Sequence, residues 1–297
     1  VNADQGAKLP THLLHWPAIR AHNGHPSPYG VEYLQIGNEW WLYAAEVAKK
    51  VNLGNPDSLA RWYLTCLKAY IRTIRRVSPE IKIVIDGVMG NAIERIVLSD
   101  PFVRAQVTLL DYHKYAPGPM DSPTIDGKPA VLDSLSPDDW WKAWTAMPGE
   151  YSENGENQAI AFSIAHAESL GYRIACNEWN WNGWGYGALK PKPSYDWGLA
   201  AGLGVAGFLN GLMRCGNTVE IACQSLLVGT SWNITSIRAD STAINDPYYL
   251  PQGQVSMLYS NYHGNRLLKV ETSNIPVYEQ RLAVGWDGPR KSVAAID

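Results

Sequence analysis

The strongest constraint on the fold is a regular alternation of short apolar segments with long amphipathic ones. Residues 31–39, 81–86, 107–113, 173–178 and 219–224 have the length and composition of buried strands. Helical spacing of apolar residues predicts helices over 58–77, 158–170, 197–214 and 251–263, with Ser58 as the N-cap of the first. Strands that alternate with helices are parallel and joined by crossover connections. The pattern therefore predicts an α/β fold in which the loops after the strands build the site, as in a (β/α)8 TIM barrel.

Charge and hydropathy exclude two classes of partner. The formal net charge is −3 and the pI is about 6.2. These values argue against nucleic acid as the main partner, since proteins that bind nucleic acid usually present a basic face. The uncharged segment 198–213 contains Gly207 and Gly211 at the spacing of membrane helix pairs, but it is too short to span a bilayer and includes Asn210. We expect no membrane partner, and we expect the small residues to let this helix lie close to a sheet.

The cysteines give no indication of a metal site. Cys66, Cys176, Cys215 and Cys223 form no CxxC pair and have no histidine at ligand spacing. We therefore expect no metal. The sequence leaves open whether the four thiols are free or paired in disulfides.

Two of the predicted strands end in the same pair of residues, and a tryptophan follows each pair. Asn38-Glu39 closes the first strand before Trp40, and Asn177-Glu178 closes the fourth before Trp179. A single glutamate at a strand end usually caps a helix or pairs with an arginine. Two copies at the catalytic face of one barrel instead suit a retaining glycosidase, which needs two carboxyl groups about 5 Å apart. The repeat favours Glu39 and Glu178 as catalytic residues.

Aromatic residues with a polar group are in excess. The chain has 13 Trp and 16 Tyr against 3 Phe, and such rings suit stacking on sugars as well as core packing. Many of them fall in two long segments after predicted strands, which hold Trp140, Trp141, Trp144, Trp179, Trp181 and Trp184. Long segments in this position are usually functional, so we expect a carbohydrate to stack there.

Four motifs in order resemble one family. Residues 20–30 running into 33–39 are similar to the acid/base region of glycoside hydrolase family 51, the α-L-arabinofuranosidases of clan A. Residues 177–180 resemble the nucleophile motif of that family. Residues 206–214 and 258–268 resemble its last barrel helix and the entry to its β-sandwich.

The resemblance assigns roles to individual residues. It implies that Glu39 is the acid/base on barrel strand four and Glu178 the nucleophile on strand seven. It implies that Asn38 binds the sugar 2-hydroxyl, that Tyr115 orients the nucleophile, and that His113 lines the subsite. From its position alone, His113 is more simply a core residue. The resemblance implies a carbohydrate substrate and neither a metal nor an organic cofactor.

The resemblance gives weaker support to three further substrate contacts. Gln224 matches the strand-eight glutamine of the family only after a shift of two residues. The family has Asp where Asn177 stands and Trp where Asn182 stands. Trp181 and Trp179 are the residues near the nucleophile that we expect to supply the stacking surface. These departures concern the shape of the subsite more than the mechanism.

The position of Glu39 implies an incomplete barrel. In the family its strand is the fourth of eight, whereas only residues 1–30 precede it here. We therefore expect residues 1–263 to be the later part of a catalytic barrel, and 264–297 to begin a β-sandwich, because 266–272 and 280–284 are strand-like without a helix between them. Five parallel strands do not close a barrel, so a companion chain could supply the others. Homo-oligomers are also compatible with the resemblance, and localisation is not readable.

The resemblance predicts an enzyme that releases α-L-arabinofuranosyl residues from xylan, arabinan or derived oligosaccharides with retention of configuration. The Trp-rich segments leave a second possibility within the clan, an endo-β-1,4-glucanase or xylan-active enzyme with a long cleft. A third possibility, from another class, is a carbohydrate-binding protein without catalysis.

Overall fold

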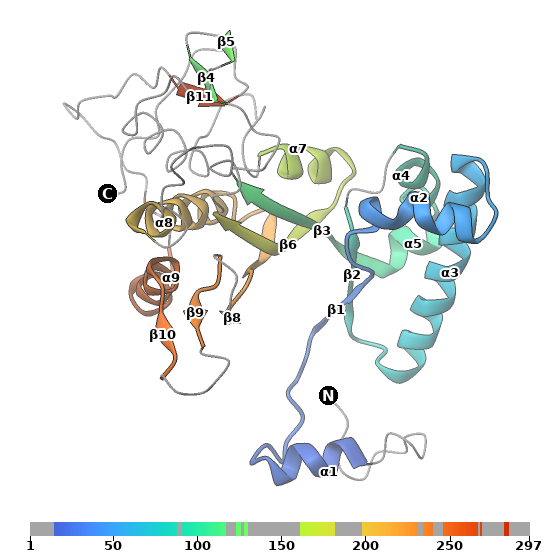
Figure 1. Ribbon diagram of the computed structural model, residues 1–297. Coiled ribbons are helices and arrows are strands. Elements are labelled where there is room, and N and C mark those ends of the chain that lie inside the picture. Colours follow the sequence, from blue (N-terminus) through green and yellow to red (C-terminus); the bar gives the residue numbers. More distant parts are fainter. Residues whose placement is uncertain are drawn as a thin grey trace. The chain divides into compact units, whose positions relative to one another are not determined.

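The computed structural model describes residues 15–87, 91–116, 123–125, 128–129, 161–181, 198–230, 234–239, 246–266, 268 and 282–284 (Figure 1). The chain divides into two compact units, Val1–Leu109 and Leu110–Asp297. The division falls inside β3 (Val107–Ala116), so that this strand begins in the first unit and continues in the second. Each unit is taken by itself below.

The first unit contains parallel strands with helices between them. β1 (Tyr33–Ile36) pairs in parallel with β2 (Lys82–Asp86), with Tyr33 opposite Lys82 and Ile36 opposite Ile85. The strand order is β1-β2-β3. The described helices of this unit are α1 (His15–His22), α2 (Trp40–Lys50), α3 (Pro56–Val77), α4 (Asn91–Val97) and α5 (Pro101–Gln106). The parallel pairing agrees with the prediction made from alternation.

Helix α3 supplies much of the core of this unit. It buries Leu59, Tyr63, Leu67 and Ile71, which recur every four residues and so share one face. Its start corrects the sequence prediction, because Ser58 is not the N-cap. The cap is Asn55, whose side chain accepts the Ser58 N–H at 2.9 Å, and Pro56 fits the first helical turn because its fixed φ matches the helix.

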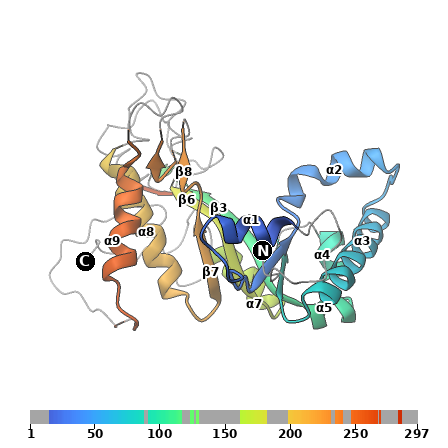
Figure 2. The same cartoon turned by 90° about the horizontal axis from the view of Figure 1, so that it is seen from below.

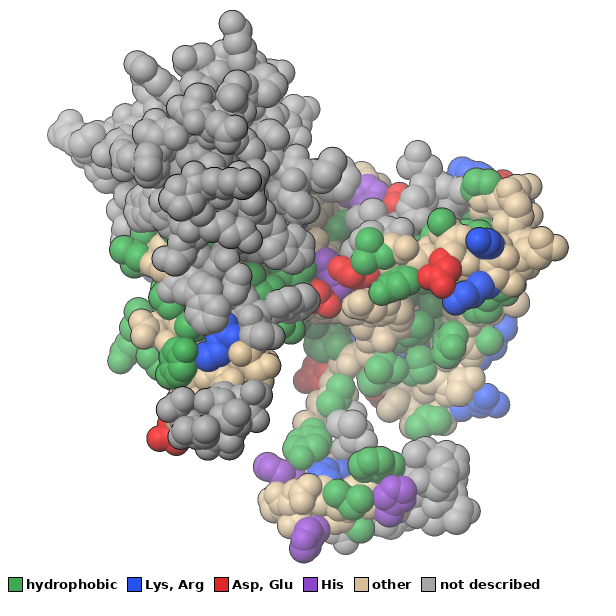
Figure 3. Space-filling model, viewed as in Figure 1, with side chains coloured by type: hydrophobic (Ala, Val, Ile, Leu, Met, Phe, Trp, Pro, Cys, Tyr) green, Lys and Arg blue, Asp and Glu red, His purple; other side chains and the backbone are tan. Residues whose placement is uncertain are grey.

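Helix α1 contributes little to the core. Hydrophobic and histidine side chains gather at the surface of this segment (Figure 3). Trp16 and Ile19 are exposed, and Arg20 is buried. The Arg20 guanidinium donates to the backbone carbonyls of His25 and Pro26, each at 3.0 Å, and so fixes the turn that follows the helix.

The second unit has a parallel core and two smaller sheets, one mixed and one antiparallel. The strand order is β3-β6-β7, where β6 is Arg173–Trp181 and β7 is Val219–Gln224, and β6 and β7 run parallel. The described helices are α7 (Ala161–Ser169), α8 (Leu199–Arg214) and α9 (Pro251–Tyr262). Short strands form two further sheets, one of β8 (Val228–Gly229), β9 (Ile237–Arg238) and β10 (Tyr248–Tyr249), the other of β4 (Pro123–Ile125), β5 (Lys128–Pro129) and β11 (Leu282–Val284).

Small residues let α8 lie against β6, as the sequence predicted. A Cβ on Gly204 would come within 2.1 Å of Cδ1 of Trp181, so only glycine fits there. The Trp179 ring packs on Phe208 of the same helix, with 5.3 Å between the ring centroids. On its other side α8 runs beside α9 (Figures 1 and 2), where a Cβ on Gly202 would lie 3.3 Å from the Pro251 carbonyl oxygen. Within the described part of the chain, no helix combines the length and apolarity that crossing a membrane requires.

Some observed elements differ from the predicted ones in their bounds. β1 is shorter than predicted, Tyr33–Ile36 against 31–39. β3 and β6 each run three residues beyond the predicted end, while β7 has the predicted bounds. The sequence did not predict α1, α2, α4 or α5, or the short strands β8–β10. The predicted strand 280–284 contains β11, whereas most of 264–297 lies outside the described residues. The boundary at 263/264 therefore stays a prediction.

Candidate active site

Glu39 stands at the turn that joins β1 to α2. It is the N-cap of α2 and adopts a left-handed backbone conformation, with φ 49° and ψ 47°. Gly37, two residues earlier, also has a positive φ, of 97°. A left-handed glutamate is uncommon and persists only where its surroundings enforce it, which occurs most often at functional sites. The half-buried Glu39 follows the exposed Asn38, so the structure places both predicted residues beyond the carboxyl end of β1.

A buried aspartate holds this turn. Asp86 is the last residue of β2 and is 0% exposed, and its Oδ2 accepts the Trp40 N–H at 2.9 Å. A Cβ on Gly37 would lie 3.5 Å from the same oxygen, so the backbone passes close to the carboxylate. The Trp40 ring packs against Tyr63 of α3, with centroids 4.5 Å apart. Burial and the charge of Asp86 raise the pKa of Tyr63, which therefore stays neutral.

Three polar side chains share one face of β3. Asp111, His113 and Tyr115 are two residues apart, so they alternate with Tyr112 and Lys114 on the other face. The buried Tyr112 contacts His166 of α7, with 2.8 Å between its hydroxyl and Nδ1. One strand thus supports a structural hydrogen bond on one face and a polar row on the other.

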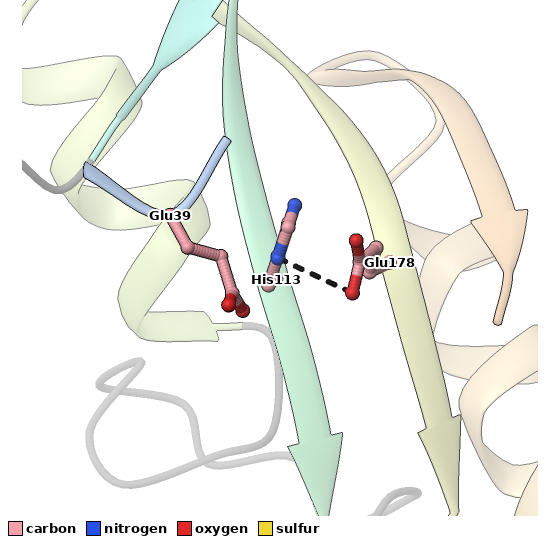
Figure 4. Close-up of side chains that lie close together, drawn as sticks. All are labelled: Glu39, His113 and Glu178. Carbon is pink, nitrogen blue, oxygen red and sulfur yellow. Dashed lines mark ion pairs between the residues drawn. The ribbon is translucent and has the colours of Figure 1, made fainter. Parts of the chain in front are cut away.

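Glu178 of β6 meets this polar row. The Tyr115 hydroxyl donates to Glu178 Oε2 at 2.7 Å. His113 Nδ1 lies 3.5 Å from the same oxygen (Figure 4). The side chain of Glu178 is 33% exposed, whereas that of His113 is only 3% exposed. Among the described residues no hydrogen bond reaches the other oxygen, Oε1. One oxygen of the carboxylate is therefore anchored by Tyr115.

A β-bulge presents Glu178. Cys176 is opposite Ala222 and Trp179 is opposite Gln224, so β6 has one residue more than β7 over this stretch. Such bulges bend a strand and redirect side chains. Asn177 lies in the bulge, and its backbone N–H donates to Asp111 Oδ1 at 3.0 Å.

The side chain of Asn177, which stands where the family has Asp, faces the neighbouring strand. Its Oδ1 lies 4.0 Å from Cys223 Sγ, in the range of a weak thiol hydrogen bond. Burial and the nearby Asp111 raise the pKa of Cys223, so the thiol keeps its proton and can donate. All four cysteines are free.

Two predicted stacking residues are core residues in the structure. Trp179 and Trp181 are each 2% exposed, because α8 covers both rings, so neither presents a face for stacking on a sugar. Trp140, Trp141, Trp144 and Trp184 lie outside the described residues.

Gln224, the last predicted substrate contact, closes β7. It is half-buried, and its Oε1 accepts a hydrogen bond from Ser256 of α9. Its Nε2 is buried without a hydrogen-bond partner among the described residues. Asn180, in the predicted nucleophile motif, is fully buried and donates to the carbonyls of Ser225 and Ile234, so its role is to fix the chain after β7.

The sequence analysis missed two residues of this site, Asp86 and Asp111. Each carries a charge in an otherwise apolar strand, and each is 0% exposed. Such a residue rarely tolerates burial without partners. That signal could have identified both, but not the backbone groups that they bind.

A comparison with protein families agrees with the resemblance over part of the chain. Residues 10–126 match the family model described as Alpha-L-arabinofuranosidase 1 domain. The matched segment contains Asn38, Glu39, His113 and Tyr115, and it confirms the resemblance there. No curated protein sequence matches the chain.

Solved structures of arabinofuranosidases share the fold. The thermostable GH51 α-L-arabinofuranosidase from Thermotoga petrophila RKU-1 is 18% identical, with a TM-score of 0.50 over 90% of this chain and 47% of that one. A structure titled as that of an arabinofuranosidase is 19% identical, with a TM-score of 0.51 over 89% of this chain and 46% of the other. The chain thus spans less than half the length of these enzymes. Together with the parallel strands, the likeness fits part of a TIM barrel.

Proposed function

We propose that this chain carries the catalytic residues of a retaining glycoside hydrolase that releases α-L-arabinofuranosyl residues from polysaccharides or oligosaccharides. The observation that carries the proposal is the state of Glu178, whose Oε2 is held by Tyr115 at 2.7 Å while Oε1 accepts nothing among the described residues. A nucleophile needs this arrangement, because attack requires a fixed carboxylate with one available oxygen. The family match over 10–126 supports the substrate class.

In the first half of the reaction Glu178 Oε1 attacks the anomeric carbon. Glu39 gives a proton to the departing glycosidic oxygen, so that the leaving group departs as an alcohol. The bond from the anomeric carbon to that oxygen breaks as the bond to Oε1 forms, and the product is a glycosyl ester of Glu178. The Tyr115 hydroxyl stays on Oε2 and keeps the carboxylate plane in place.

In the second half water replaces the glutamate. Glu39, now ionised, takes a proton from the water, whose oxygen attacks the anomeric carbon. The ester bond to Glu178 breaks, the sugar leaves with its original configuration, and both carboxyl groups regain their starting states. The left-handed turn at Glu39 and its anchor on Asp86 would hold the acid/base group in the one position from which it serves both steps.

The proposed substrate contacts follow from the same residues. Asn38, exposed beside Glu39, is proposed to bind the sugar 2-hydroxyl, a contact that strengthens as the oxocarbenium-like transition state forms. Gln224 is a second candidate, because its buried amide nitrogen has no partner among the described residues. We further propose that additional barrel strands, from a longer chain or from a companion subunit, complete the subsite, and that a C-terminal β-sandwich follows.

Chemical rescue tests the proposal and both assignments. We expect Glu178→Ala to lower hydrolysis of 4-nitrophenyl α-L-arabinofuranoside by roughly 10³-fold or more, because the covalent step is lost. Azide should restore release of nitrophenol and give a glycosyl azide of inverted configuration. Glu39→Ala with azide should give the retained azide, because Glu178 still forms the ester. Glu220→Gln, a glutamate on β7 that pairs with Arg173, is the matched control and should keep activity.

The alternatives predict other results. An endo-β-1,4-glucanase or xylan-active enzyme would leave the arabinofuranoside intact and cleave the β-1,4-linked polymer. A carbohydrate-binding protein would bind the sugar equally well with and without Glu178 and hydrolyse neither substrate. Either result would refute the proposed activity.

A further inference from the structure

The helix that follows Glu39 is capped by a residue of a different element. Glu39 is the N-cap of α2, but its side chain makes no capping hydrogen bond. The first N–H of the helix, that of Trp40, donates instead to Oδ2 of Asp86 on β2, at 2.9 Å. The N–H of Leu42 donates to the Glu39 backbone carbonyl, also at 2.9 Å. Two N–H groups of the first turn therefore have acceptors, and neither acceptor is the Glu39 carboxyl group.

Strand pairing brings Asp86 to this helix. β1 and β2 are parallel, with Ile36 opposite Ile85. The next residue of β2 is Asp86, and the residue after the end of β1 is Gly37, where the turn toward α2 begins. Asp86 is 0% exposed, so little water is available as an alternative acceptor. The register of the sheet thus places a buried acidic group at the N-terminus of α2, where the helix carries a partial positive charge.

The same hydrogen bond constrains the backbone of Glu39. An N-cap residue usually has an extended backbone, from which its side chain turns back to the second or third N–H of the helix. Glu39 is instead left-handed, with φ 49° and ψ 47°. The Trp40 N–H belongs to the peptide group whose orientation is set by the ψ angle of Glu39, so the bond to Asp86 holds that angle. Hydrogen bonds to a carboxylate are roughly twice as strong as neutral ones, and a left-handed glutamate needs such support.

We propose that Asp86 is a positioning residue that caps α2 in place of Glu39, and thereby keeps the Glu39 carboxyl group directed to the substrate instead of to its own helix. The catalytic consequence rests on the proposed function, in which Glu39 is the acid/base group, whereas the capping does not. In Asp86→Ala the Trp40 N–H loses its acceptor, and Glu39 is the acidic residue next to the helix N-terminus. We therefore expect its side chain to turn toward α2 and to leave the position from which it protonates the leaving oxygen.

NMR of one backbone amide tests the capping in the full chain. The dipeptide Glu-Trp occurs only at 39–40 and 178–179. Labelling of Glu with ¹³C at the carbonyl and of Trp with ¹⁵N therefore selects the amides of Trp40 and Trp179, and Glu178→Gln removes the second signal and so assigns both.

We expect hydrogen exchange of the Trp40 amide to become at least about 10-fold faster in Asp86→Ala, while that of Trp179 stays unchanged. Asp86→Asn keeps an uncharged oxygen that can accept the Trp40 N–H, so its increase should be smaller. Faster exchange of both amides would show that Asp86→Ala does not fold, and Asp86→Asn then gives the test. Wild-type exchange of the Trp40 amide in the folded variant would overturn the proposal.

The catalytic part is tested with two substrates that differ in their leaving group. A sugar alcohol departing from an arabino-oligosaccharide needs the proton of Glu39, whereas 2,4-dinitrophenolate departs without one. We expect Asp86→Ala to lower kcat/KM for the oligosaccharide roughly 100-fold, as for a reacting group displaced by about 1 Å, and for 2,4-dinitrophenyl α-L-arabinofuranoside by less than about threefold. Asp100→Ala is the matched control, because Asp100 caps α5 in the same unit, and it should lower neither value.

Two results would refute the positioning role. One is an equal loss with both substrates in Asp86→Ala, which a general structural defect would produce, and the other is wild-type kcat/KM for the oligosaccharide. If the wild type itself hydrolyses neither substrate, the proposed function fails, and hydrogen exchange of the Trp40 amide still decides whether Asp86 caps α2.

Discussion

Removal of one hydroxyl group gives the most direct test of the candidate site. In Tyr115→Phe the ring remains, but the hydrogen bond from its hydroxyl to Glu178 Oε2, 2.7 Å long, is lost. The carboxylate then gains rotational freedom, and Oε1 spends less time in the position required for attack. We expect the variant to fold and to bind substrate, and to lose rate in the step that forms the glycosyl ester.

The size of the loss follows from the geometry. A hydrogen bond to a charged group contributes about 1.5–3 kcal/mol. The Glu178 side chain is 33% exposed, so water replaces part of the missing bond and the lower half of this range applies. A loss of about 1.5–2 kcal/mol corresponds to roughly a 10- to 30-fold decrease in kcat/KM.

Tyr112→Phe is the matched control. Tyr112 is three residues before Tyr115 on the same strand, and its side chain lies on the other face. The variant removes a hydroxyl that lies 2.8 Å from His166 Nδ1. The assay compares kcat/KM for the arabinofuranoside at equal concentrations of folded protein. Retention of kcat/KM within about twofold of wild type in Tyr115→Phe would refute the reasoning, and so would an equal loss in Tyr112→Phe.

Two further predictions concern stability. Gly204→Ala should destabilise the chain by about 1–3 kcal/mol in denaturant unfolding, because the new Cβ would lie 2.1 Å from Trp181. Gly202→Ala, whose nearest contact would be at 3.3 Å, should destabilise it less, and equal stabilities of the two variants would exclude close packing of α8 on β6. Burial raises the pKa of Asp100, whereas Lys68 and two backbone N–H groups of α5 lower it. The lowering is the larger effect, so the pKa of Asp100 is below its usual value. Its stabilising effect is therefore present above the unfolded-state pKa and lost as the pH falls through the folded-state pKa. Asp100→Asn should cost about 0.5–1 kcal/mol at neutral pH and nothing in acid, and a constant difference in melting temperature between the two conditions would contradict this.

The sequence predicted the parts of the site that depend on local order. Strand periodicity places His113 and Tyr115 on one face of β3 whatever else packs there, because successive side chains of a strand alternate. This alternation requires only neighbours in sequence, and the structure reproduces it. The two Asn-Glu-Trp motifs do not close their strands as predicted, because β1 ends at Ile36, before the first motif, and β6 runs through the second to Trp181.

Other features depended on residues far apart in sequence. Trp179 and Trp181 resemble stacking residues in a Trp-rich segment, but α8 covers both rings, and only Gly204 makes that approach possible. Ser58 is a good N-cap by type, but Asn55 precedes a proline that begins the helix earlier. In both cases the local sequence is compatible with two structures. Packing against α8 decided the first case, and the proline after Asn55 decided the second.

By itself, the sequence determined an α/β chain with parallel strands, two glutamates in repeated Asn-Glu-Trp motifs, and a resemblance that names the chemistry. Only the tertiary structure decided which atom of Glu178 is anchored, that a bulge presents it, and that Asp111 lies behind it. The physical reason is that local pattern fixes the face on which a side chain lies. The partner that it meets there is set by contacts across the sheet, here between residues more than sixty positions apart.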